Sequence, residues 1–119
     1  MTQPLSGIDR SLGYVKHALE VSLLRQQAIQ SNLANASTPT YKRVEVKFES
    51  LLPKDVDAQS FIGTKPAVVR DMSPGRADGN NVEFDVEYAN LEKNRLQFEA
   101  LAEIASLRIQ GMRSAIQSK

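Results

Sequence analysis

The chain has 119 residues, with 15 Lys and Arg against 14 Asp and Glu, so its formal charge is only +1. This length fits one domain with a modest core, and the balanced charge excludes a strongly basic nucleic-acid binder. The chain has no cysteine, which excludes a disulfide framework and a thiolate metal site. No segment approaches the ~20 apolar residues that span a bilayer, so we expect no direct membrane insertion.

The first 41 residues are dominated by a helical pattern. Its apolar positions recur in alternating steps of four and three, which is the spacing of a coiled-coil seam. Polar Ser22 and Gln26 interrupt the seam, either to fix the register or to face a polar partner. A second apolar face includes Val21 and Leu24. The seam itself consists of Ile8, Leu12, Val15, Leu19, Ile29 and Leu33.

The segment SNLANASTPTYKR, residues 31–43, ends this helix. Pro39 disfavours helical geometry at the residue before it, so the helix should end between Asn35 and Ser37. Asn32 and Asn35 can pair with the carbonyls freed at the helix end or with a neighbouring chain. Ala36 is small enough for close backbone approach, and Tyr41 is suited to anchor the emerging chain.

Residues 42–81 contain three Pro and three Gly, which excludes long helices there. Alternation over 44–48 predicts a strand, and residues 61–62 and 67–69 are expected to form short extended pieces. Lys42, Arg43 and Lys47 form a small basic patch. The patch is either a solvated strand edge or an ion-pair partner for the acidic 83–92 region of a neighbouring copy.

Residues 82–119 predict a second long helix. Val82, Phe84 and Val86 alternate with acids, which indicates an extended entry, with Asp85 or Asn81 as N-cap. The acids of 83–92 favour the helix dipole, and their spacing fits no calcium loop. The helix has one seam of apolar residues and beside it a second stripe. The seam is Phe98, Ala102, Ala105, Ile109, Met112 and Ile116, and the stripe is Leu101, Ile104 and Leu107.

These patterns predict a mainly α fold. Long N- and C-terminal helices should pair as a coiled-coil-like hairpin around a short irregular or β-rich middle. The predicted boundaries are residues 1–41 for the first helix and its exit, 42–81 for the middle, and 82–119 for the second helix.

Catalytic chemistry is not indicated. His17 is the only histidine and has no cysteine or convergent carboxylates near it in the sequence. The serines lie in no nucleophile motif, and no glycine-rich phosphate loop occurs. We therefore expect no enzyme activity, no catalytic residues, no metal and no cofactor.

Each helix has more apolar surface than one helix pair can bury. Val21 and Leu24 on the first helix and Leu101, Ile104 and Leu107 on the second appear spare, and the middle is short and polar. Monomers seldom leave so much contiguous apolar surface in water. The chain should therefore complete its core with other chains, either as a subunit of an assembly or as a helical-hairpin adaptor or chaperone-like module that binds a partner helix.

Two motifs resemble a known family. Residues 32–41, NLANASTPTY, resemble the N-(I/L)-A-N-A-x-T-P-G-Y motif of bacterial flagellar rod, hook and junction proteins. Residues 78–94, DGNNVEFDVEYANLEKN, resemble a run typical of the FlgB family of proximal rod proteins. Thr40 replaces the family's Gly. Because Thr tolerates a positive φ poorly, we expect a type I or open turn there.

The resemblance implies a structural rod subunit whose terminal helices pack into a helical tube. Its implied partners are further copies of itself, other rod proteins, a base-of-rod adaptor, the membrane ring and the export gate, and not nucleic acid. The N-terminus shows no secretory signal, so the implied route to the basal body is flagellar type III export without cleavage. The expected assembly interface comprises Leu12, Val15, Leu19, Val21, Leu24, Ile29, Asn32, Leu33, Asn35, Ala36, Pro39, Tyr41, Asn94, Phe98, Leu101, Ile104, Ala105, Ile109, Met112 and Ile116.

Overall fold

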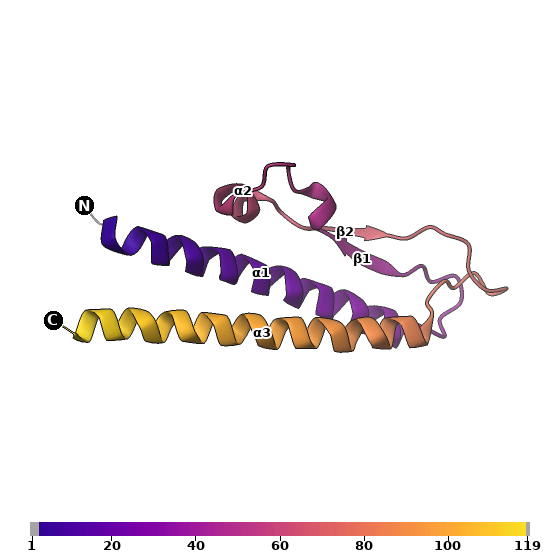
Figure 1. The fold of residues 1–119 in the computed structure, drawn as a ribbon. Coiled ribbons are helices and arrows are strands. Elements are labelled where there is room, and N and C mark those ends of the chain that lie inside the picture. The colour runs from indigo at the N-terminus through magenta and orange to yellow at the C-terminus, as the bar shows by residue number, and fades with distance from the viewer. Residues whose placement is uncertain (1–2, 119) are drawn as a thin grey trace.

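The computed structural model describes residues 3–118, with side chains described from Arg10 to Ser118. Its elements in chain order are α1 (Gln3–Ala34), β1 (Val44–Lys47), the 3-10 turn η1 (Glu49–Leu51), α2 (Ala58–Gly63), β2 (Ala67–Arg70) and α3 (Phe84–Gln117). The molecule is elongated, 67 × 26 × 16 Å. Helices α1 and α3 lie side by side and antiparallel, with both termini at one end (Figure 1). The predicted fold class is confirmed.

The seam between α1 and α3 contains a buried polar group at its centre. Asn94 of α3 donates to the backbone carbonyl of Ser22 at 2.8 Å and accepts from the Ser22 hydroxyl at 3.2 Å. The Asn94 amide also donates to Gln26 at 3.2 Å. The two polar residues that interrupt the first seam therefore meet a polar partner in the same chain. A single buried Asn in such a seam fixes the register of two helices at a cost in stability.

The middle segment, residues 42–81, packs on the side of α1 away from α3 (Figure 1). Strands β1 and β2 pair antiparallel from Val44 opposite Arg70 to Lys47 opposite Ala67, which confirms the two strands predicted at 44–48 and 67–69. The extended piece predicted at 61–62 is wrong, because both residues lie in α2. Asp57 and Ser60 form a capping box that starts this short helix.

The middle segment also covers the second face of α1. Val21 and Ala28 form a buried cluster with Val46 and Phe48, and Leu24 is one of four partly buried residues packed against it. The prediction that Val21 and Leu24 are spare is therefore wrong. The reason is that the middle segment, although polar in composition, alternates at 44–48 and turns its apolar side chains onto the helix.

Helix α3 begins two residues before the start that an Asp85 N-cap predicts and two residues after the start that Asn81 predicts. Its N-cap is Glu83, and neither Asp85 nor Asn81 takes that position. Phe84 and Val86 are helical rather than extended. The extended entry runs through Glu83, and the preceding Val82 is fully buried, with its backbone N–H donating to the Asn80 side chain at 2.7 Å.

The prediction of a type I or open turn at Thr40 is wrong, because the φ of Thr40 is +65°. One hydrogen bond and the close approach of Gly79 hold it in this left-handed conformation. The Thr40 N–H donates to the carbonyl of Asp78 at 2.8 Å, and a Cβ on Gly79 would lie only 3.3 Å from the Thr40 Cα. The 78–79 turn therefore holds Thr40 in a conformation that a β-branched residue adopts at a cost of about 1–3 kcal/mol.

Thr40→Gly should raise the free energy of unfolding by about 1 kcal/mol, since glycine takes this φ without strain. Urea denaturation followed by circular dichroism measures the change. Thr38→Gly, two residues earlier in the same turn, is the control and should destabilise. If Thr40→Gly destabilises as much as Thr38→Gly, the left-handed conformation is incorrect.

Candidate assembly interface

The end of α1, the entry to β1 and the loop before α3 meet in one hydrogen-bonded cluster, here called the motif junction (residues 32–43 and 71–87). Its centre is Asn32, which is fully buried. The Asn32 side chain accepts from the backbone N–H of Val44 at 2.8 Å and donates to the Val44 carbonyl at 2.9 Å, which reproduces a strand pairing at the edge of β1. The same amide donates to Glu87 at 3.1 Å and accepts from the Tyr41 hydroxyl at 3.0 Å.

A second buried asparagine closes the C-terminal end of α1. The Asn80 side chain donates to the carbonyls of Asn35, Ala36 and Thr38 at 2.9, 3.1 and 2.9 Å. Arg76 adds a further donor to the Ala36 carbonyl at 2.7 Å. Carbonyls at a helix end lack intrahelical partners, and a buried end must satisfy them otherwise. Here the loop before α3 satisfies the exit of α1.

One ion pair joins the start of α3 to the middle segment. The side chain of Glu87 is only 1% exposed and accepts from Arg43 Nε at 2.6 Å. Burial opposes the charge on Arg43, but its hydrogen bonds and charge attraction to Glu87, with the hydrogen bond to Asp71, outweigh burial and raise the pKa of Arg43 above its usual range. The side chain and backbone N–H of Ser73, followed by Arg43, lower the pKa of Asp71. The basic patch and the acidic region therefore pair within one chain at this point.

The two sequence motifs thus fold against each other. Tyr41 and Asn35 both act near the helix exit as expected: the Tyr41 hydroxyl binds Asn32, and the Asn35 amide donates to the Ser31 carbonyl at 2.9 Å. The sequence did not identify Asn80 as a partner, and it offered the pairing of Arg43 with the acidic 83–92 region only between neighbouring copies, not within one chain. The only available signal was the run of asparagines at 80–81 beside acids, which does not specify a partner 45 residues away.

The expected interface residues fall into three groups by exposure. Some have side chains buried within the chain: Val15, Val21, Ile29, Asn32 and Asn94. Others are half-buried: Leu12, Leu19, Leu24, Leu33, Asn35, Ala36, Tyr41, Phe98, Leu101, Ala105 and Met112. The remainder are exposed: Pro39, Ile104, Ile109 and Ile116.

An open apolar stripe runs along α3. We call it the outer face of α3 and define it by Val86, Leu96, Ile104 and Leu107, which are 40–58% exposed. On an ideal helix these positions lie within about 80° of one another. They point away from the side on which Glu87 and Asn94 are buried against α1. This stripe has no covering element within residues 3–118.

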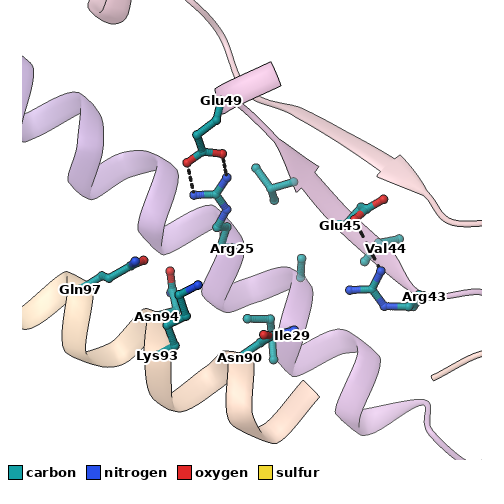
Figure 2. A pocket seen from close by; sticks show the side chains of 12 residues that line it. Arg25, Ile29, Arg43, Val44, Glu45, Glu49, Asn90, Lys93, Asn94 and Gln97 are labelled. Carbon is teal, nitrogen blue, oxygen red and sulfur yellow. Dashed lines mark hydrogen bonds and ion pairs between the residues drawn. The ribbon is translucent and has the colours of Figure 1, made fainter. Parts of the chain in front are cut away.

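A groove lies between α3 and the middle segment, with α1 at its floor. It contains two cavities of about 350 Å³ each. Figure 2 shows the first, where Gln97, Asn94 and Asn90 of α3 face Glu49 and Val44 across α1. Arg25 and Glu49 form a two-pronged ion pair across its upper wall. The hydrogen bond from Arg25 lowers the pKa of Glu49, so this pair is present at neutral pH.

His17, the only histidine of the sequence, has a structural role. The His17 ring donates from Nε2 to the Thr64 carbonyl at 2.7 Å and lies edge-on to Phe61, so it ties α2 to α1. Within residues 10–118 no group of three or more His, Cys, Asp or Glu could hold a metal ion. No helix in the described part of the chain is both long and apolar enough to cross a membrane.

No protein-family model matches the chain. It is similar to several bacterial proteins named Flagellar basal body rod protein FlgB. The protein from Cereibacter sphaeroides is 29% identical over 128 residues, covering 97% of this chain and 100% of that protein. The Escherichia coli K12 protein is 28% identical over 135 residues, covering 96% and 98%. The Borreliella burgdorferi protein is 29% identical over 122 residues, covering 84% and 90%.

Proposed function

Since this chain is a relative of the FlgB flagellar basal body rod proteins over nearly its whole length, we propose that it is a structural subunit of the bacterial flagellar rod. The observation that carries the proposal is that the similarity takes in both long helices and the middle segment rather than one motif. The relatives come from several bacteria and share one name. The alternative of an adaptor or chaperone-like module is not favoured by any of them.

The outer face of α3 supports this role. A rod subunit must offer surface to neighbouring copies, and apolar side chains exposed in a row serve this purpose. Each buried Leu or Ile gains about 1.5–3 kcal/mol, so covering Leu96, Ile104 and Leu107 would contribute several kcal/mol to assembly. The motif junction supports the role differently, because it locks the two helices and the middle segment into one rigid unit.

The finer assignments extend the proposal. The chain occupies the proximal part of the rod, because residues 78–94 resemble the proximal rod family. Its terminal helices pack into the inner layer of a helical tube. Its neighbours are further copies, other rod proteins, the base-of-rod adaptor, the membrane ring and the export gate. It reaches the basal body through the flagellar export route without signal cleavage.

Deleting the gene in the source bacterium and restoring it with an epitope tag tests the proposal. We expect the deletion strain to be non-motile, and the restored strain to swim and to yield purified basal bodies that contain the tagged chain. Normal motility without the gene, together with recovery of the chain only in a discrete soluble complex, would instead indicate the adaptor role.

A further inference from the structure

The molecule carries opposite charges at two separate places along its length. Residues 3–19 and 104–118, which form the end of the hairpin where both termini lie, contain four Lys and Arg and one acid. Residues 83–103, which run from the motif junction to the middle of α3, contain six acids and two bases. The hairpin therefore has a basic end, and the first part of α3 is acidic.

The charges at the basic end are available for a partner. We define the basic end by Arg10, Lys16, Arg108 and Arg113, all exposed. Among the described side chains none of the four takes part in an ion pair. Exposed apolar residues lie among them: Tyr14, Leu107, Ile109 and Ile116.

The acids of α3 form a row. Asp85, Glu92, Glu99 and Glu103 lie within about 40° of one another on an ideal helix, beside Leu96 of the outer face. We call this row the acidic face. Arg95 pairs with Glu92 at 3.0 Å and with Glu99 at 2.7 Å. Within the described residues, Asp85 and Glu103 have no such partner.

We propose that the basic end of one copy docks on the acidic face of α3 of the next copy, so that the chain associates head to tail. The occupant is a second copy because one chain carries both halves of the complementary pair, each mixed with exposed apolar side chains. The inference rests on the proposed function, since a rod subunit must meet other copies. It adds which surfaces meet.

The geometry of this contact favours an open assembly. The two surfaces are different and follow one another along α3: the acidic face ends at Glu103, and Arg108 of the basic end lies roughly 7.5 Å further along the helix. When each pair of copies makes this contact once, the contact is heterologous, and it generates a filament unless the rotation closes a ring. An antiparallel dimer would make the same charge contact twice and stop at two copies, so the head-to-tail arrangement predicts species larger than a dimer in sedimentation velocity.

Charge reversal tests the proposal with the full-length chain. One variant reverses the basic end (Arg108→Glu with Arg113→Glu), and another reverses the acidic face (Glu99→Lys with Glu103→Lys). Each alone should weaken self-association by about tenfold or more, as measured by sedimentation velocity. The two mixed together should associate again, because each then offers the complement of the other. Lys54→Glu with Lys65→Glu in the middle segment is the control and should associate like the unmodified chain.

Several results would overturn the inference. These are an unmodified chain that stays monomeric at about 0.05 M salt, single variants that associate normally, or a mixture that fails to recover while each variant keeps its helical circular dichroism. The basic end would instead be a membrane-surface site if its reversal abolished binding to phosphatidylserine vesicles and left self-association unchanged. Should the chain enter basal bodies while the charge swap fails, the inference falls and the proposed function stands.

Discussion

Replacing Glu87 with alanine is expected to lower the free energy of unfolding by about 3 kcal/mol, because it leaves a partly buried cation without its closest partner. Glu87 accepts from Arg43 at 2.6 Å and from Asn32 at 3.1 Å, and its side chain is almost fully buried. Arg43 would retain Asp71 at 3.3 Å, which moderates the loss. Urea denaturation followed at 222 nm gives the change.

Glu92→Ala is the matched control for this substitution. Glu92 lies on the same helix and, among the described residues, pairs only with Arg95 at the surface, where such pairs contribute about 0–1 kcal/mol. If both alanine variants unfolded at the same urea concentration, Glu87 in the motif junction would stabilise the fold no more than a surface ion pair does. Glu87→Gln should fall between them, since its amide oxygen can still accept one of the two hydrogen bonds.

Introducing aspartate at Leu96 and Leu107 together should abolish incorporation into the rod while leaving the fold intact. Both side chains are more than half exposed in the free chain, so the substitutions cost little there. In an assembly that covers the outer face of α3, two unpaired carboxylates would be buried, at a cost of several kcal/mol each.

Basal bodies purified from cells expressing the variant provide the measurement, with Met72→Asp as control. Met72 is the most exposed of the large apolar residues described and lies in the middle segment rather than on α3. A double variant that enters the rod as efficiently as the Met72→Asp chain would show that the outer face of α3 does not contact another subunit.

The two long helices and the first strand could be predicted from their apolar periodicity, and the second strand from a short run of apolar residues at 67–69. Seam positions recur at 3.5 residues on average in both helices, and residues 44–48 alternate. Helix α2 was missed because its six residues show no period. Its only signal is the Asp57–Ser60 capping box, which lacks the more usual Glu at the third helical position.

The remaining errors have a common cause, namely that contacts distant in the sequence override local preference. Thr40 disfavours a positive φ, but the 78–79 turn imposes it. Val21 and Leu24 were predicted to be spare because the composition of the middle segment is polar. In the structure a few apolar side chains of that segment, such as Phe48, point toward α1 and cover them. The sequence predicted that Asn32 and Asn35 pair with backbone groups, but it did not predict that Asn80 and Glu87 take part in the same cluster.

The central claim is that the chain completes the core around α1 by itself and leaves the outer face of α3 for neighbouring subunits. A cryo-EM map of the intact basal body, with this chain traced at side-chain resolution, tests it most directly. We expect Leu96, Ile104 and Leu107 to lie against another subunit, while Val21 and Phe48 remain in contact within one chain. A map in which those three side chains face solvent, or in which the middle segment has left α1, would contradict the account.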